Sequence, residues 1–201
     1  MTKTGEKPRV GIIIGTTREG RFGDKPARWI ENLADRHGRL QPEIVDLRDY
    51  RIPFFDQPGS PAWVGTHHDE GKRWERKMGE LDGYIFVTAE YNHGPSAVLK
   101  NALDHAYNVY NKKPAAFVGY GMLGAARSIQ QLRQILIELK VAPLRDAVHI
   151  NAAEYFGVLR EGKSLDDYPH LAETANTMLD ELAWWTIALK AARTEIAAAA
   201  A

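Results

Sequence analysis

Short apolar runs alternate with longer amphipathic stretches along most of the chain. The apolar runs predict strands at Arg9–Ile14, Glu43–Leu47, Gly83–Thr88, Ala115–Gly119 and Ala147–Ile150. Apolar residues at helical spacing predict helices at Ala27–His37, Glu70–Leu81, Ala97–Tyr107, Gly124–Leu139 and Leu171–Arg193. Apolar strands that alternate with helices are typical of a parallel sheet covered on both faces. We therefore expect an α/β fold.

Connections between parallel strands are right-handed, which leaves few possible strand orders. The pattern favours a flavodoxin-like, doubly wound five-stranded parallel sheet of order 2-1-3-4-5, with helices on both faces. The chain shows no internal repeat or linker, so residues 1–201 are expected to form a single domain, with flexible tails at 1–8 and 195–201. The irregular segment Asp49–Thr66 interrupts the alternation, and a loop of this length is usually functional.

Composition narrows the possible functions. The 26 basic and 26 acidic side chains give a formal net charge of zero, so no long-range field draws the chain to nucleic acid or to an anionic membrane. The absence of cysteine excludes disulfides, a thiolate nucleophile and a cysteine zinc site. No apolar run approaches the length of a membrane span. We expect a cytoplasmic enzyme without membrane insertion.

The loop Gly15–Gly23 joins the first strand to the first helix. Backbone amides at a helix N-terminus form an anion site, and Thr16, Arg18 and Arg21 add hydroxyl and guanidinium donors. A P-loop would need Lys-Ser/Thr where Arg21 and Phe22 stand, and the dinucleotide fingerprint would need a second glycine where Thr17 stands. The loop therefore predicts a phosphate site. A polar turn with solvated arginines is the alternative.

Two further loops follow the third and fourth predicted strands. The first reads Thr88-Ala-Glu-Tyr-Asn-His-Gly-Pro-Ser96 and runs into Ala97-Val-Leu-Lys-Asn-Ala-Leu-Asp104. It faces the phosphate loop across the point where strand order reverses, which is where such sheets bind ligands. The second is the glycine-rich turn Gly119–Arg127. Lys100, Asn101 and Asp104 can equally serve only to cap and anchor their helix.

These motifs resemble the NAD(P)H-dependent FMN reductases, a family that includes bacterial quinone, chromate and azo-dye reductases. The string Glu-Tyr-Asn-x-Ser/Gly…Leu-Lys-Asn-Ala-Leu-Asp carries most of the resemblance, which extends from about Arg9 to Arg193. The resemblance implies that FMN is bound by three groups of residues: Thr16, Arg18, Arg21, Phe22 and Gly23 at the phosphate; Glu90, Tyr91, Asn92, His93 and Gly94 at the ring; and Tyr120, Gly121 and Gly124 beside it. Many members have Ser in place of Arg21, Asn in place of Gly23 and Pro in place of Ala89.

The resemblance also implies a reaction. NADPH or NADH passes hydride to bound FMN, and a small-molecule acceptor such as a quinone, free flavin or an azo compound then takes the electrons in a ping-pong cycle. No catalytic side chain and no metal is expected; His67-His68-Asp69 is the nearest metal candidate, and a solvated loop explains it better. Trp184 and Trp185 are expected in the core or at an interface, because the family forms homodimers and homotetramers. The alternatives are an electron carrier or redox sensor acting on a protein partner, or a related module that has lost its cofactor.

Overall fold

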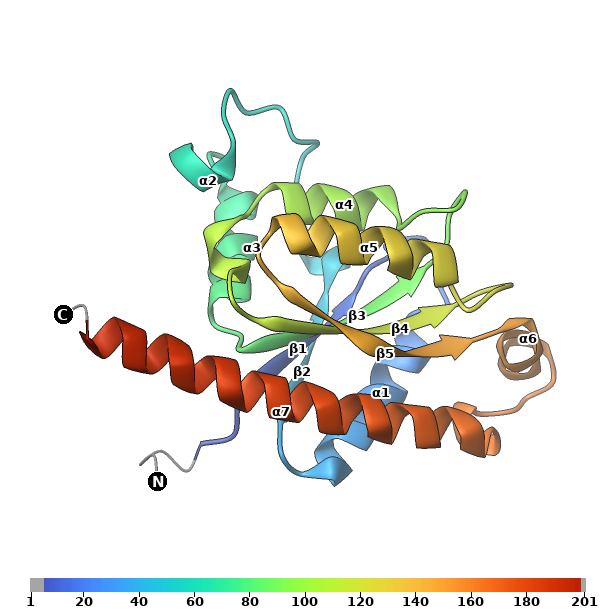
Figure 1. Cartoon of the computed structure of the whole chain (residues 1–201). Helices are drawn as coiled ribbons and strands as arrows, with labels where there is room; N and C mark the ends of the chain where they lie inside the picture. The colour runs from blue at the N-terminus through green and yellow to red at the C-terminus, as the bar shows by residue number, and fades with distance from the viewer. Residues whose placement is uncertain (1–5, 200–201) are drawn as a thin grey trace.

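The structure is a computed structural model that describes residues 6–199 (Figure 1). Its strands are β1 (Arg9–Ile14), β2 (Gln41–Asp46), β3 (Gly83–Ala89), β4 (Pro114–Tyr120) and β5 (Ala142–Ile150). They form one sheet of order β2-β1-β3-β4-β5, in which every neighbouring pair is parallel. The predicted doubly wound sheet is therefore confirmed.

Helices cover both faces of the sheet. They are α1 (Asp24–His37), α2 (Pro61–Val64), α3 (Asp69–Gly79), α4 (Ala97–Asp104), α5 (Ala126–Glu138), α6 (Ala152–Arg160) and α7 (Pro169–Ala199), with short 3-10 turns η1 (Leu47–Asp49), η2 (Asn108–Tyr110) and η3 (Leu165–Asp167). Figure 1 shows α3, α4 and α5 on one face and α1 and α7 on the other.

The central strands are almost entirely apolar because each of their faces meets a helical layer. Every residue of β3 is buried. Its side chains alternate, so Ile85 and Val87 join the core cluster under α1 and α7, whereas Tyr84 and Phe86 join the cluster under α3, α4 and α5. This two-sided burial produces the continuous hydrophobic run seen in the sequence.

The chain differs from the prediction mainly near its C-terminal end. Strand β5 begins at Ala142 and contains Pro143, which an edge strand tolerates because one side of its backbone needs no partner. Helix α6 was not predicted. Helix α7 continues to Ala199, so the described part of the expected 195–201 tail is helical, while residues 1–5 and 200–201 lie outside the described range. None of the described helices combines the length and apolarity that a membrane crossing requires.

The irregular segment after η1 lies along α3 and α4 and includes α2 (Figure 1). Asn101 of α4 anchors it, since its Nδ2 donates to the Pro53 carbonyl at 2.8 Å and its Oδ1 accepts from the Phe55 N–H at 2.9 Å. Lys100 and Asp104 instead form an ion pair within α4, at 2.7 Å. The polar residues of this helix thus serve packing and anchoring in the structure.

Candidate functional site

Three loops meet at the carboxyl ends of β1, β3 and β4. The Gly15 N–H donates to the Val87 carbonyl at 2.9 Å, and the Ser96 hydroxyl, which also caps α4, donates to the Gly15 carbonyl. The hydroxyls of Thr16 and Tyr120 are 3.2 Å apart. The structure therefore brings together the three loops predicted from the sequence. The pocket between them has a volume of about 100 Å³ and is lined by Arg18, Arg21, Phe22, Ala89, Glu90, Tyr91, Tyr120, Gly121 and Tyr155.

The first loop carries hydrogen-bond donors that the fold itself does not use. Among the described residues, none accepts a hydrogen bond from the backbone N–H groups of Thr17, Arg18, Glu19 or Gly20. The side chain of Arg18 is exposed at the pocket and forms no ion pair within residues 6–199. Consecutive unpaired amides beside a cation, just before a helix, are typical of anion sites, so the predicted phosphate site remains a candidate.

Arg21 is held inside the loop. Its guanidinium forms ion pairs with Asp46 at the end of β2 and with Asp24 at the start of α1, and it donates to the Thr16 carbonyl. Burial alone would lower the pKa of Arg21, but the hydrogen bonds with Asp46 and Asp24 raise it above its usual value. Burial likewise opposes ionisation of Asp46, but its hydrogen bond with Arg21 lowers the pKa of Asp46. Arg21 thus braces the loop, and its contact with a phosphate stays a prediction.

Phe22 and Gly23, the last two residues of the first loop, pack closely against residues of the third loop and of α6. The Phe22 ring is 3% exposed and packs against the rings of Tyr120 and Tyr155, with centroid distances of 5.2 and 4.6 Å. A Cβ at Gly23 would lie 2.9 Å from the Tyr120 hydroxyl oxygen and 3.3 Å from Thr16 Oγ1. A larger residue at position 23 would therefore push the first and third loops apart.

The second loop is a tight turn. The N–H of Tyr91 donates to the Gly94 carbonyl at 2.9 Å, and the N–H of Gly94 donates back at 3.1 Å. Asn92 and His93 both have positive φ angles, of 49° and 70°, as a two-residue type I′ turn requires. Tyr91 is left 39% exposed at the pocket. The turn thus presents a flat aromatic side chain to a ligand.

Arg127, in the first turn of helix α5, holds this turn in place. It donates to Glu90 from its backbone N–H, at 3.0 Å, and from Nε, at 2.6 Å. A guanidinium can only donate, so His93 Nε2, 2.9 Å from Arg127 Nη1, accepts. Burial favours a protonated Glu90, but hydrogen bonds with Arg127 lower its pKa. Glu90 is therefore ionised and anchors the turn to α5, and the expectation that it is not an acid–base catalyst stays a prediction.

The third loop requires glycine because it closely approaches β5. Gly124 has a φ of 55°, and a Cβ there would lie 2.6 Å from the Cβ of His149. Tyr120, at the end of β4, is 5% exposed, and burial raises its pKa to about 12 despite the opposing hydrogen bond with Thr16. Tyr120 therefore stays a neutral wall of the pocket, next to Gly121.

Several residues at the site were not predicted from the sequence: Asp46, Arg48, Ser96, Arg127 and Tyr155. The position of Asp46 at the end of a predicted strand was a usable signal, because strand ends in such a sheet lie near the ligand. Tyr155 lies on α6, which the apolar pattern did not reveal. Arg48 and Arg127 act through contacts with residues more than 25 positions away, and no local pattern marks such contacts.

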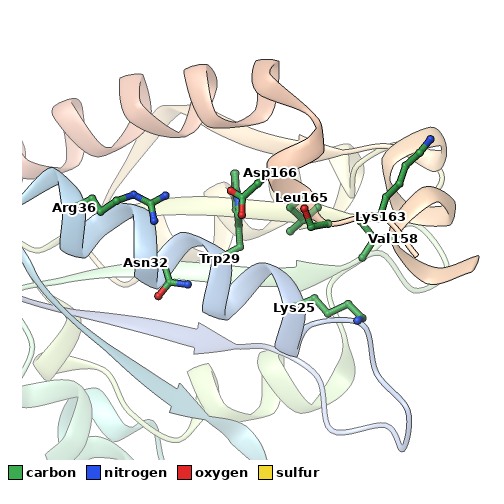
Figure 2. A pocket seen from close by; sticks show the side chains of 9 residues that line it. Lys25, Trp29, Asn32, Arg36, Val158, Lys163, Leu165 and Asp166 are labelled. Atoms are coloured by element: carbon green, nitrogen blue, oxygen red, sulfur yellow. The ribbon is translucent and has the colours of Figure 1, made fainter. Parts of the chain in front are cut away.

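A larger cavity, of about 280 Å³, lies away from these loops, between α1 and the segment that joins α6 to α7 (Figure 2). The Trp29 indole N–H donates to Asp166 there at 3.1 Å. Figure 2 shows Arg36 and Lys163 toward opposite ends of the cavity, so its cations do not converge on one point.

No group of three or more potential metal ligands occurs within residues 6–199. In the predicted metal candidate His67-His68-Asp69, the Nε2 of His68 lies 2.7 Å from the Oδ1 of Asp56.

The chain is similar to known flavin enzymes over most of its length. The profile of a family described as NADPH-dependent FMN reductase matches residues 8–154. An NAD(P)H-dependent FMN reductase of Pseudomonas aeruginosa is 34% identical over 191 residues, covering 89% of this chain and 95% of the relative. One from Schizosaccharomyces pombe is 35% identical over 145 residues, covering 70% and 72%. A quinone reductase of Escherichia coli is 29% identical over 166 residues, covering 79% and 81%.

Solved structures show the same fold. The flavoenzyme FerB, an NAD(P)H:(acceptor) oxidoreductase from Paracoccus denitrificans, has a TM-score of 0.68 at 22% identity, covering 89% of this chain and 97% of that one. RosB has a TM-score of 0.71 at 14% identity, covering 96% and 88%. The chain therefore belongs to the NADPH-dependent FMN reductase family, and it is an oxidoreductase that uses FMN and a reduced nicotinamide.

Proposed function

We propose that the 15–23 loop holds the FMN phosphate and that the flavin ring lies between the 90–94 turn and the 119–124 loop. The observation that carries this assignment is the run of unpaired amides at Thr17–Gly20 beside the uncommitted side chain of Arg18. Both donor types match phosphate oxygens. Arg21 and Phe22 replace the Lys-Ser/Thr of a P-loop, so the donors suit a phosphate monoester better than a magnesium-bound triphosphate.

The remaining predicted residues fit the rest of such a ligand. Tyr91 offers an exposed aromatic face, and Gly121 brings backbone to the pocket without a side chain. The buried hydroxyl pair of Thr16 and Tyr120 joins the phosphate loop to the ring loop, so the two would move together. These contacts support a binding site for a flat ring that is joined to a phosphate.

When bound, FMN supplies the redox chemistry, taking hydride from NADH or NADPH and passing electrons to an acceptor. The residues of the chain bind and orient the reactants. Tyr91 lines the pocket, and Met122, exposed next to the pocket residue Gly121 in the chain, would add apolar surface for the nicotinamide and then for the acceptor. Because both reactants would use one opening in turn, we propose a ping-pong order. Glu90 is committed to Arg127, and no proton transfer is assigned to it.

We propose quinones, free flavin, azo compounds and similar small molecules, metal oxyanions included, as the electron acceptors. The similarity to the quinone reductase of Escherichia coli supports the first of these. The zero net charge gives no overall negative charge to attract a protein partner, which favours small-molecule acceptors over an electron-carrier function.

The test is a two-stage experiment on purified protein loaded with FMN. Anaerobic mixing with NADPH or NADH should bleach the flavin absorbance, and steady-state turnover with a benzoquinone should give parallel lines in double-reciprocal plots. Intersecting lines would refute the ping-pong order. A yellow protein that neither nicotinamide reduces would indicate a carrier or sensor, and a protein that takes up no FMN would refute the cofactor site.

We also propose a homodimer or homotetramer in the cytoplasm. Trp184 is 57% exposed on α7 and Trp63 is 87% exposed on α2, whereas Trp185 packs against the core. Large exposed aromatic side chains are enriched at subunit interfaces. The lack of cysteine is compatible with a reducing compartment. Analytical ultracentrifugation would test the assembly, and a monomer at all concentrations would contradict it.

A further inference from the structure

Two arginines bind three consecutive carbonyl groups of the first loop. Arg21 Nη1 donates to the Thr16 carbonyl. Arg48, in the η1 turn after β2, donates from Nε to the Thr17 carbonyl at 3.3 Å and from Nη2 to the Arg18 carbonyl. The planar fork of one guanidinium thus holds two adjacent peptides.

These contacts determine where the loop amides point. In a trans peptide, the C=O of one residue and the N–H of the next point in opposite directions, and the described chain has no cis peptide. The N–H groups of Thr17, Arg18 and Glu19 must therefore point away from the two guanidiniums. They belong to the run from Thr17 to Gly20 whose amides have no hydrogen-bond acceptor within residues 6–199.

Asp46 connects both arginines to the sheet. It forms an ion pair with Arg21, whose side chain is 2% exposed, and its Oδ1 accepts from the backbone N–H of Arg48 at 2.9 Å. Asp46 is the last residue of β2, so the loop conformation is tied to a strand end. Contacts within the protein thus orient the amides.

We propose that Arg21, Asp46 and Arg48 form a positioning brace that gives this chain its selectivity for phosphorylated over unphosphorylated flavins. An unbraced loop would have to become ordered when a phosphate binds, and that loss of conformational entropy weakens affinity. This entropy cost lowers the affinity for FMN alone. Riboflavin has no phosphate, so it contacts only the second and third loops and does not require the first loop to be ordered. The proposal rests on the FMN site proposed above.

Arg48 is the position to test, because it is exposed and lies outside the core. The experiment compares wild type with Arg48→Gln, Arg48→Lys and the control Arg28→Gln, which replaces an exposed arginine of α1. Each apoprotein is titrated with FMN and with riboflavin, and flavin fluorescence measures binding. We expect Arg48→Gln to raise the FMN Kd by about 10-fold, the scale of one lost charge-assisted hydrogen bond. Its riboflavin Kd should not change, and Arg28→Gln should match wild type for both ligands.

The Arg48→Lys variant and the dependence on salt concentration distinguish a positioning role of Arg48 from direct electrostatic attraction of the phosphate. Attraction between Arg48 and a phosphate would be screened by salt and restored by lysine. We expect instead that Arg48→Lys stays defective and that the defect is the same at low and high ionic strength. Equal weakening of both ligands, no weakening, or rescue by lysine would each overturn the brace. A wild-type protein that binds neither flavin, or binds both equally well, would instead overturn the FMN site itself.

Discussion

Replacing Asp46 with asparagine tests how much the buried ion pair at the end of β2 stabilises the fold. The asparagine would keep the shape of the side chain but leave the Arg21 guanidinium, 2% exposed, without its main counter-charge. Removing one partner of a buried pair costs about 3–5 kcal/mol. Asp46 is itself 24% exposed and Asp24 remains beside Arg21, so the cost falls at or below the lower end of that range. We expect Asp46→Asn to lower the free energy of unfolding by about 2–3 kcal/mol.

The same pair predicts a pH dependence. Burial raises the pKa of Asp46, but its hydrogen bond with Arg21 outweighs burial, so the folded-state pKa is lowered. Its contribution is therefore present above the unfolded pKa of about 3.9 and is lost as the pH falls through the lower, folded pKa. Wild type should lose more stability than Asp46→Asn across that acid range.

Urea unfolding followed by circular dichroism, at neutral and acid pH, would measure both effects. The control is Asp180→Asn, because the Asp180 carboxylate is 66% exposed and its contacts with His37 and Arg39 are open to solvent on the Asp180 side. Surface pairs contribute about 0–1 kcal/mol, so this variant should remain near wild type. If Asp46→Asn were as stable as the control at neutral pH, the reasoning about the buried pair would be wrong.

Three further outcomes are expected. Arg18→Ala should weaken FMN binding by about 1.5–3 kcal/mol, the scale of a hydrogen bond to a charged group, and unchanged affinity by flavin titration would remove Arg18 from the site. Gly124→Ala should destabilise the fold by about 2–4 kcal/mol in urea unfolding, combining a left-handed φ with a clash against His149; a smaller loss would show that the third loop can shift. Burial lowers the pKa of Lys113 to about 7, so the free energy of unfolding should rise with pH from there toward the unfolded pKa of about 10.4. Lys113→Met should flatten that rise, and identical pH profiles would contradict it.

The sequence alone determined the architecture and which loops meet at the candidate site. Alternating apolar runs and amphipathic stretches specify a parallel sheet, and the right-handed crossover rule leaves the strand order that the structure shows. Loops after strands 1, 3 and 4 must then meet at one edge. The predicted phosphate site depends only on neighbouring residues, since glycine, hydroxyl and basic side chains within one loop are what favour it over a plain polar turn.

Tertiary structure decided what each charged residue does. Arg21 and Arg18 look alike in sequence, yet Arg21 is buried on Asp46, 25 positions away, while Arg18 stays at the pocket. The carbonyl contacts of Arg48 and the anchoring of Glu90 by Arg127 likewise join separate elements. Such pairings depend on which side chains the packed elements bring within hydrogen-bond distance, and no periodicity along the chain encodes that distance.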